Sequence, residues 1–198
     1  YDVYVRNLIR IDRIEVFLTS RCTLNCEKCI SYIPYFTRKR DIPLEQLKKD
    51  ADILFSKVDY IYKLKLLGGE GLLYPYLIEY IDYLCERYQD KIGTIRIGTN
   101  GTILPNQEIL DMCVRNHVIL DVSDYSQAVP DKSRLNEIKT LCDKNHVAIE
   151  IKRTGEQWLD LGFPDKTLDK RNEKQIQEHF YGCAMFCRQF GQGKMWFC

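Results

Sequence analysis

The sequence lacks any long hydrophobic run. Of its 198 residues 45% are hydrophobic, yet no apolar stretch approaches the roughly 20 residues that a transmembrane helix needs. The N-terminus also lacks the basic and then apolar segments of a signal peptide. We therefore expect a cytoplasmic protein with no membrane partner.

A charge excess of one sign is missing as well. The chain carries 29 basic and 28 acidic residues, for a formal net charge of +1. Because the two signs nearly cancel, the protein has no overall electric field that would recruit nucleic acid or an anionic membrane surface. We expect no nucleic-acid partner.

The length suits one globular domain that buries a substantial core. The sequence begins at Tyr1 rather than at Met, and it stops at Cys198 inside what resembles a cysteine motif. We expect both ends to be trimmed.

Cysteine is abundant, with nine residues in a chain that has no secretion signal. The cytosol keeps thiols reduced, so a disulfide framework is a poor explanation. Metal ligation is the better interpretation.

Apolar runs alternate with amphipathic stretches over the first three quarters of the chain. This alternation is typical of repeated βα units that build a parallel sheet. The predicted strands are Ile14 to Thr19, Tyr62 to Leu67, Thr94 to Thr99, Val118 to Ser123 and Val147 to Lys152.

Three cysteines lie on the apolar stripes of predicted helices. Cys85, Cys113 and Cys142 follow helical spacing, and a free cysteine in such a position behaves as a small buried hydrophobe. We predict structural roles for all three.

The pattern C-x-x-N-H-V occurs twice, at residues 113–118 and 142–147, each time between a helix and a strand. Asn tolerates the left-handed conformation that ends helices. Helix-to-strand junctions lie at the N-terminal edge of a parallel sheet, whereas active sites form at the opposite edge. This geometry favours a structural role for His117 and His146 over a two-histidine metal or acid-base site.

Cys22, Cys26 and Cys29 follow the first predicted strand as C-T-L-N-C-E-K-C. Thiolates at this spacing can ligate three irons of a four-iron cluster. A cluster held only by protein wants four cysteines, and so does a closed zinc site. The triplet therefore predicts a site completed by a substrate or cofactor, although half of a zinc site is an alternative.

Further polar loops follow the next predicted strands. They contain Gly68-Gly69-Glu70, Thr99-Asn100-Gly101 and Ser123-Asp124-Tyr125. Paired glycines let the backbone approach a ligand closely, and a carboxylate can accept hydrogen bonds from an ammonium group. Because the strands are parallel, all of these loops are expected at one edge of the sheet.

The combination resembles the radical S-adenosylmethionine (radical SAM) superfamily, whose shared motifs are a C-x-x-x-C-x-x-C loop after the first strand and a G-G-E loop after the second. The resemblance covers roughly the first 155 residues. It implies that Cys22, Cys26 and Cys29 bind a 4Fe-4S cluster whose open iron is chelated by S-adenosylmethionine. It also implies contacts to S-adenosylmethionine from Gly68, Gly69 and Glu70 at the methionine amine, and from Thr99, Asn100 and Ser123 at the ribose and carboxylate. For the last three, ordinary turn chemistry is the alternative.

Two positions depart from the family pattern. Lys28 stands where an aromatic residue commonly packs near the adenine, so Tyr32, Tyr35 or Phe36 would supply that contact unless they belong to the core. Gly71 replaces the proline that commonly follows G-G-E, and we expect it to leave the loop less restrained.

A second cysteine group lies near the end of the chain. Cys183, Cys187 and Cys198 surround a predicted hairpin turn at Gly191-Gln192-Gly193. The group resembles the SPASM or twitch extensions of the superfamily, which bind an auxiliary 4Fe-4S cluster. The fourth ligand would come from the substrate, from beyond Cys198 or from a residue such as His179. A zinc knot or simple packing are the alternatives.

The expected fold class is α/β: a partial (β/α) barrel of the radical SAM type in residues 1–155, followed by a small cysteine-containing hairpin extension in residues 156–198. The resemblance implies an enzyme of oxidoreductase or isomerase type that cleaves S-adenosylmethionine reductively to a 5′-deoxyadenosyl radical. That radical abstracts hydrogen from a substrate. The electron donor would be external, such as flavodoxin or ferredoxin.

The substrate is a small molecule or a peptide. Superfamily enzymes with such extensions are mainly maturases of ribosomally made peptides, and a smaller group oxidises sugar or cyclitol alcohols. Segments 122–126 and 158–162 resemble members linked to carbohydrate pathways, so oxidation or epimerisation of a small polyhydroxylated compound is slightly favoured. The candidate substrate contacts are Asp124, Tyr125, Lys152 and Arg153, for which salt bridges or surface positions are equally compatible.

A different class of function is a non-enzymatic iron-sulfur or zinc module. The open triplet together with Glu70 argues against it.

Overall fold

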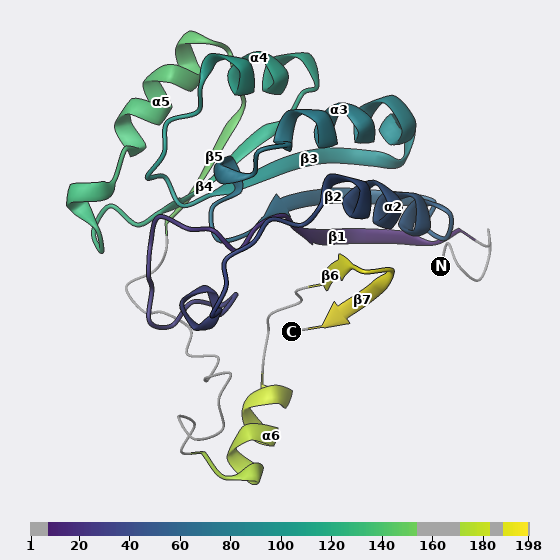
Figure 1. Ribbon diagram of the computed structural model, residues 1–198, viewed down its shortest axis with the longest axis vertical. Helices are drawn as coiled ribbons and strands as arrows, with labels where there is room; N and C mark the ends of the chain where they lie inside the picture. The colour runs from purple at the N-terminus through teal and green to yellow at the C-terminus, as the bar shows by residue number, and fades with distance from the viewer. Residues whose placement is uncertain (1–7, 154–170, 183–187, 198) are drawn as a thin grey trace.

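A computed structural model describes residues 8–153, 171–182 and 188–197. Within these ranges, one sheet has the strand order β5-β4-β3-β2-β1-β6-β7 (Figure 1). The strands are β1 (Arg10–Phe17), β2 (Tyr60–Leu67), β3 (Ile92–Thr99), β4 (Ile119–Asp124), β5 (Ile149–Arg153), β6 (Arg188–Gly191) and β7 (Lys194–Phe197). The α-helices are α2 (Leu44–Phe55), α3 (Leu77–Tyr88), α4 (Gln107–Arg115), α5 (Leu135–Lys144) and α6 (Glu173–Tyr181). Short 3-10 helices are η1 (Ile33–Tyr35), η2 (Gly71–Leu73), η3 (Gln89–Lys91) and η4 (Pro130–Lys132).

Strands β1 to β5 are all parallel and are hydrogen-bonded in sequence order. Ile14 pairs with Leu64, and Leu64 pairs in turn with Ile95. Helices follow β1 to β4, as repeated βα units require. The predicted α/β architecture is confirmed. Consequently the loops after β1 to β4 meet at one edge of the sheet.

The two faces of the sheet differ in polarity. One face carries alternate apolar side chains, including Ile14, Leu66 and Val122, all of which are at most 4% exposed. Helices α2 to α5 cover this face (Figure 1), and their apolar stripes complete the core. The opposite face carries charged side chains such as Lys65, Arg96 and Asp121. A strand alternates its side chains between faces, so β2 to β4 each direct apolar side chains to the core and at least one charged side chain to the opposite face.

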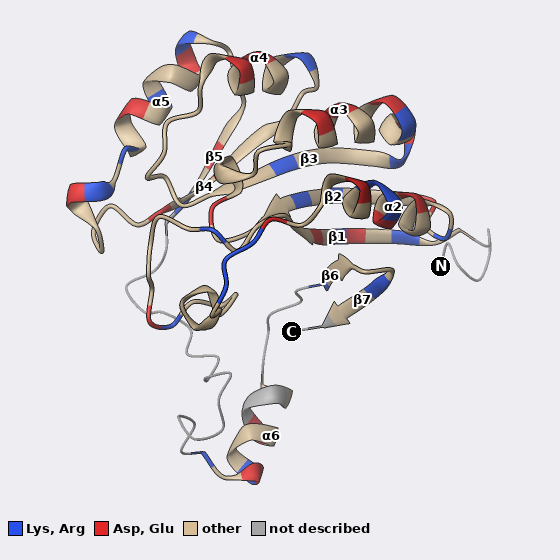
Figure 2. Ribbon diagram, in the orientation of Figure 1, with Lys and Arg blue, Asp and Glu red and all other residues tan. Residues whose placement is uncertain are grey.

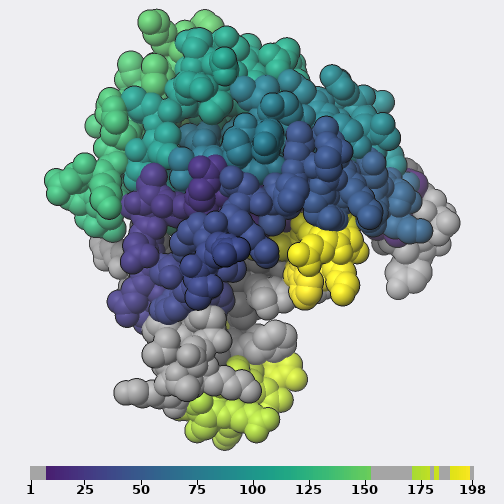
Figure 3. All heavy atoms as spheres, viewed as in Figure 1, coloured from purple at the N-terminus to yellow at the C-terminus, as the bar shows by residue number. Residues whose placement is uncertain are grey.

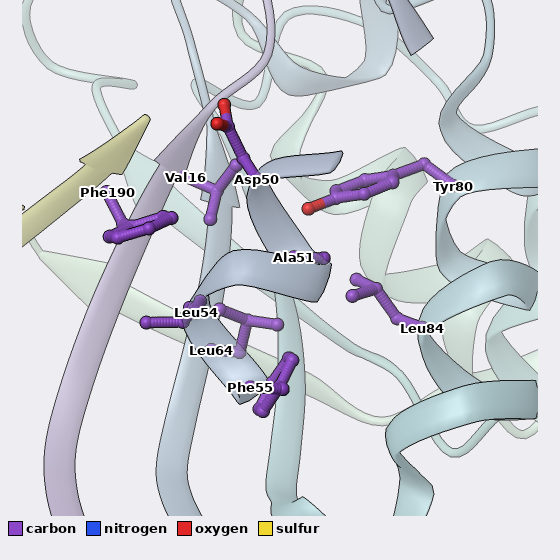
Figure 4. A pocket seen from close by; sticks show the side chains of 9 residues that line it. All are labelled: Val16, Asp50, Ala51, Leu54, Phe55, Leu64, Tyr80, Leu84 and Phe190. Carbon is purple, nitrogen blue, oxygen red and sulfur yellow. The ribbon is translucent and has the colours of Figure 1, made fainter. Parts of the chain in front are cut away.

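The C-terminal hairpin extends the same sheet. Strand β6 pairs parallel with β1, and β7 pairs antiparallel with β6. Their two-residue turn places Gln192 at φ 54° and Gly193 at φ 69°, as a tight hairpin turn of this length requires. The side chain of Phe190 enters the core beside Val16 and Leu54 around a void of about 10 Å³ (Figure 4).

Helix α2 holds this hairpin through one buried carboxylate. Asp50 is 3% exposed, and its two oxygens accept hydrogen bonds from the backbone N–H groups of Gln192 and Gly193, both at 2.8 Å. Gln46 donates a third, at 3.0 Å. Figure 3 shows the yellow hairpin packed beside this part of the chain.

Some predicted boundaries and the predicted left-handed residues at two helix ends were wrong. Strand β1 begins four residues before Ile14, and β5 begins two residues after Val147. The left-handed residues at the two C-x-x-N-H-V junctions are His117 and His146, at φ 53° and 57°. Asn116 and Asn145, at φ −103° and −101°, cap the helices without adopting that conformation. The junctions do lie at the N-terminal edge of the sheet, as predicted.

In the described residues, no helix combines the length and hydropathy needed to cross a bilayer.

Candidate cluster and cofactor site

The cysteine loop, residues 18–42, leaves the end of β1 and returns to the start of α2. Its two ends are hydrogen-bonded to each other: Ser20 N–H donates to the Arg40 carbonyl at 2.9 Å, and Ile42 N–H donates to Leu18 at 2.8 Å. Inside the loop, Leu24 is 9% exposed and anchors it to the protein. The loop is therefore a closed structure fixed at its base.

Cys22, Cys26 and Cys29 are half-buried on this loop. The Cys22 sulfur accepts hydrogen bonds from Leu24 N–H at 3.4 Å and from the side-chain amide of Asn100 at 3.5 Å. Burial raises the pKa of the Cys22 thiol and of the Cys26 thiol, and the charges of the other cysteines raise that of Cys26 further. The three sulfurs are thus within electrostatic reach of one another.

A single metal ion does not fit this arrangement. Among the described residues, no three His, Cys, Asp or Glu side chains converge closely enough to hold one ion. Three thiols on one loop that do not converge on a point suit a multi-iron cluster, in which each cysteine ligates a different iron.

The glycine loop after β2 lies directly against the cysteine loop. Gly69 N–H donates to the Thr19 carbonyl and Glu70 N–H to the Arg21 carbonyl, both at 2.8 Å. A Cβ atom on Gly68 would stand 2.3 Å from the Thr19 carbonyl oxygen, and one on Gly69 would stand 2.3 Å from that of Arg21. Only glycine allows this approach, because the neighbouring atoms are backbone.

Glu70 is 1% exposed and connects the loops after β2 and β3. Its Oε1 accepts from Leu72 N–H at 3.0 Å, and its Oε2 accepts from Asn100 N–H at 2.8 Å. Burial raises the pKa of this carboxyl, although these hydrogen bonds and one from Thr99 act in the opposite direction. Each carboxylate oxygen retains a further lone pair for another donor.

Asn100 links the third loop to the cysteine loop. Its side-chain amide donates to Thr23 Oγ1 at 3.0 Å as well as to Cys22. Its Oδ1 accepts from the Thr102 hydroxyl at 2.6 Å, and Thr102 also contacts Thr23, with 2.5 Å between the hydroxyl oxygens. The sequence reasoning missed Thr23 and Thr102, whose only signal was a position beside a predicted site residue.

The loop after β4 lies close to the same site. Burial raises the pKa of Tyr125, and the charges of Cys26, Cys29 and Cys22 raise it further, while a hydrogen bond with Ser123 lowers it. The phenol is therefore near the cysteine loop. Asp124 instead accepts a hydrogen bond from Ser126 N–H within its own loop, at 2.9 Å.

Lys152 belongs to an ion-pair network on the face of the sheet opposite helices α2 to α5. It donates to Asp121 Oδ2 at 2.9 Å, and Lys65 reaches the same oxygen at 3.0 Å. Lys65 extends from β2 across β3 at Gly98, where a Cβ atom would stand 3.0 Å from its Cε. Of the predicted substrate contacts, Arg153 ends β5, and its side chain lies outside the described residues.

Burial raises the pKa of Asp121, but the hydrogen bonds and charges of Lys152 and Lys65 outweigh it and hold the pKa below the ordinary range. The sequence reasoning missed Asp121 and Lys65. The signal that could have identified them is a charged residue between apolar neighbours in each of the strands β2 and β4.

The structure describes both positions that depart from the family pattern, Lys28 and Gly71. Lys28 is exposed, and the nearby Tyr32 and Tyr35 rings meet edge to face at 6.5 Å, while Phe36 is 44% exposed. Gly71 is closely restrained, contrary to expectation: a Cβ atom there would stand 2.6 Å from the Gly98 carbonyl oxygen.

The remaining cysteines divide into two sets. Cys113 and Cys142 are at most 1% exposed in the core, and Cys85 packs against it, as predicted. Cys183, Cys187 and Cys198 lie outside the described residues, as does the side chain of His179.

Curated relatives share parts of this sequence. A Methanocaldococcus jannaschii protein whose name gives it as a glycyl-radical enzyme activating enzyme is 25% identical over 184 residues, which are 85% of this chain and 68% of that protein. The GTP 3′,8-cyclase of Rhizobium leguminosarum bv. trifolii is 33% identical over 129 residues. This alignment covers 61% of our chain but only 34% of the cyclase, so the chain spans about a third of that relative's length.

Solved structures share the fold at low sequence identity. BtrN in complex with AdoMet and 2-DOIA has a TM-score of 0.60 at 19% identity, covering 82% of this chain and 63% of BtrN. Streptococcus suis SuiB bound to its precursor peptide SuiA has a TM-score of 0.59 at 14% identity, covering 80% of this chain and 36% of SuiB.

The family model described as the radical SAM superfamily matches residues 16–169, which include the cysteine loop, the glycine loop and strands β2 to β5. The chain belongs to the radical SAM superfamily.

Proposed function

We propose that the chain is the core of an enzyme that binds a 4Fe-4S cluster and S-adenosylmethionine and uses them to abstract hydrogen from a substrate. The observation that carries this proposal is the contact between loops at one edge of the sheet. Asn100 donates to both Cys22 and Glu70, to the Cys22 sulfur through its side-chain amide and to the Glu70 carboxylate through its backbone N–H. The loops after β1, β2 and β3 are thereby joined by hydrogen bonds at one place.

The residues present fit the cluster. Cys22, Cys26 and Cys29 would hold it, because their thiols share one closed loop and do not converge on a single ion. N–H groups directed at the Cys22 sulfur would stabilise its thiolate form. The chemistry that this group supplies when bound is the one-electron cleavage of S-adenosylmethionine, which generates a 5′-deoxyadenosyl radical able to abstract hydrogen.

The protein's part is to bind and orient the cofactor. Gly68 and Gly69 would present bare backbone to the methionine moiety, and Glu70 would accept its ammonium group through a remaining lone pair. Thr99, Asn100 and Ser123 remain our proposed contacts to the ribose and carboxylate.

We favour a small polyhydroxylated substrate, such as a sugar or cyclitol that is oxidised or epimerised. The face of the sheet opposite helices α2 to α5 supports this choice, because the side chains of Lys152 and Glu150 are 48% and 44% exposed there and carry both donors and acceptors for hydroxyl groups. A peptide substrate is the alternative. A small-molecule complex and a peptide complex match this fold almost equally, with TM-scores of 0.60 and 0.59. Asp124, Tyr125 and Arg153 remain candidate contacts for either.

We also propose that residues 156–198 form a SPASM-like or twitch-like extension, distinct in function from the core in residues 1–155. Cys183, Cys187 and Cys198 would bind an auxiliary 4Fe-4S cluster there. Iron and sulfide analysis tests this proposal: about eight irons per chain are expected. A value near four would contradict it.

The core proposal is tested by anaerobic reconstitution with iron and sulfide, followed by reduction and incubation with S-adenosylmethionine. The expected product is 5′-deoxyadenosine, measured by chromatography. The variant Cys26→Ala should lose it, whereas Cys85→Ala, which replaces a cysteine of α3 away from the loop, should retain it. An intact, reduced cluster that yields no 5′-deoxyadenosine would instead favour a non-enzymatic iron-sulfur module, and tightly bound zinc in place of iron would favour a zinc module.

A further inference from the structure

A basic run lies against the start of the cysteine loop. Arg38, Lys39 and Arg40 are consecutive and exposed, and Figure 2 shows them as a continuous blue stretch between β1 and α2. The backbone of Arg40 is fixed to Ser20 by three hydrogen bonds, at 2.9, 2.7 and 3.1 Å. Since Ser20 precedes Cys22 by two positions, the run is held close to the proposed cluster.

The positive charge of this run is largely uncompensated. Neither Arg38 nor Arg40 pairs with a carboxylate in the described part of the chain, and Asp41, the nearest acidic residue in sequence, is bound by Arg21 at 3.0 Å. Lys39 donates to the Ile33 carbonyl, a neutral acceptor, and this hydrogen bond fixes the position of its side chain. For a protein whose net charge is +1, this is a concentrated local excess.

An apolar groove of about 780 Å³ adjoins the run, between the cysteine loop and the hairpin. Ile30, Phe36 and Trp196 line it and are 48%, 44% and 52% exposed, while Arg40 lies on its border. Figure 3 shows the loop and the hairpin on the same side of the molecule. Exposed aromatic side chains bordered by arginine are the composition of protein–protein interfaces.

We propose that this surface, formed by Ile30, Phe36, Arg38, Lys39, Arg40 and Trp196, docks an acidic protein that carries a reduced flavin. The inference rests on the proposed function, because a cluster that cleaves a sulfonium needs an electron from outside the chain. In the docked complex one electron leaves the flavin and enters the cluster, and no bond forms or breaks. Charge complementarity selects an acidic carrier, because a positive patch on one partner steers a negative patch on the other.

The test compares two double variants of the reconstituted protein. Arg38→Glu/Arg40→Glu reverses two charges of the surface, and Lys57→Glu/Lys139→Glu makes the same change in net charge at exposed positions near the end of α2 and on α5. Each protein is reduced once with dithionite and once with reduced flavodoxin, an acidic flavin carrier. The rate of cluster reduction is followed by absorbance and by electron paramagnetic resonance.

We expect flavodoxin to reduce the Arg38→Glu/Arg40→Glu protein about tenfold more slowly than the wild type at low salt, because charge reversal removes electrostatic steering. The difference should shrink as the screening length falls from about 30 Å at 0.01 M salt to about 3 Å at 1 M. Dithionite should reduce all three proteins equally, and Lys57→Glu/Lys139→Glu should match the wild type with both reductants.

Equal rates with flavodoxin for all three proteins would overturn the docking proposal alone, and so would equal slowing in both double variants. The docking proposal would also be overturned if the charge reversal dissociated an oligomer of this chain, as seen by size-exclusion chromatography, and left the rate of cluster reduction by flavodoxin unchanged. A protein that acquires no dithionite-reducible cluster would overturn the proposed function as well, so the two failures are distinguishable.

Discussion

At the scale of single residues, three glycines decide how closely the loops of the site approach one another. Gly68, Gly69 and Gly71 have no positive φ, so their backbone conformation does not require glycine. Each instead lies where a Cβ atom would stand within 2.6 Å of a carbonyl oxygen. Close approach of backbone, and not turn geometry, explains why all three positions lack a side chain.

The variant Gly69→Ala should lower the free energy of unfolding by about 1–3 kcal/mol, because its methyl group would push the glycine loop away from Arg21. It should also impair cluster assembly. Urea unfolding and absorbance of the reconstituted cluster measure the two effects. Gly191→Ala is the matched control, since a Cβ atom there meets nothing within 4 Å. A Gly69→Ala protein as stable as this control would contradict the geometry.

Asn100 holds Cys22, which we propose as a cluster ligand, through a hydrogen bond to its sulfur. The variant Asn100→Ala removes hydrogen bonds to Cys22 and Thr23, so we expect a loss of about 1 kcal/mol in unfolding free energy and at least tenfold slower cleavage of S-adenosylmethionine. Asn106→Ala should cost a similar stability by removing the N-cap of α4 while leaving cleavage unchanged. Equal cleavage by both variants would argue against a positioning role for Asn100.

At the scale of secondary-structure elements, α2 and the C-terminal hairpin form one unit. Asp50 fixes the turn of the hairpin, and Phe190 of β6 packs into the core beneath α2. The hairpin therefore continues the sheet of the core even though its sequence lies far beyond β5 and carries a different cysteine pattern.

The variant Asp50→Ala should destabilise the hairpin, because two turn N–H groups and Gln46 lose their buried acceptor. We expect a loss of about 2–3 kcal/mol in unfolding free energy. Hydrogen exchange should show lower protection in residues 188–197 with little change in β2 and β3. Glu45→Ala, an exposed change on the same helix, should leave both measurements unchanged. Undiminished hairpin protection in Asp50→Ala would refute the anchor.

The helix ends show the limit of pattern reasoning at this scale. The repeated C-x-x-N-H-V segments correctly predicted two equivalent junctions, at the edge of the sheet away from the site. They did not predict that His117 and His146 would be the left-handed residues. In each junction the Asn still belongs to the last helical turn, because its backbone N–H donates to carbonyl oxygens of that turn. The reversal of direction therefore falls on the next residue.

At the scale of the whole molecule, ion pairs extend across four parallel strands on the face that no helix of α2 to α5 covers. Lys65 and Lys152 meet Asp121 from β2 and β5, and Arg96 of β3 pairs with Glu150 of β5. This network connects β2, β3, β4 and β5 through their side chains on that face.

The pH dependence of stability should reveal this network. Because the pKa of Asp121 is held low in the folded protein, its contribution is fully present above the ordinary aspartate value of about 3.9 and is lost as the pH falls through the lower folded-state value. Asp121→Asn should cost about 2 kcal/mol at neutral pH. The difference from the wild type should shrink in acid.

Urea unfolding at a series of pH values measures this difference. Asp131→Asn, an exposed change on η4, should lower the free energy of unfolding by less than about 0.5 kcal/mol at every pH. A constant gap between wild type and Asp121→Asn down to the acid transition would show that the aspartate's ionisation does not contribute.

The sequence by itself determined the order of strands and helices, the parallel sheet and the edge at which the polar loops gather. It did so because apolar periodicity is local, and parallel strands bring equivalent loops together. The C-x-x-x-C-x-x-C and G-G-E motifs likewise identified the superfamily. The tertiary structure alone decided which atoms meet: Asn100 with Cys22, Asp50 with the turn of the hairpin, and Lys65 with Asp121 across Gly98. Such partners are tens of residues apart, and their contacts depend on strand register and backbone distance, which no local pattern encodes.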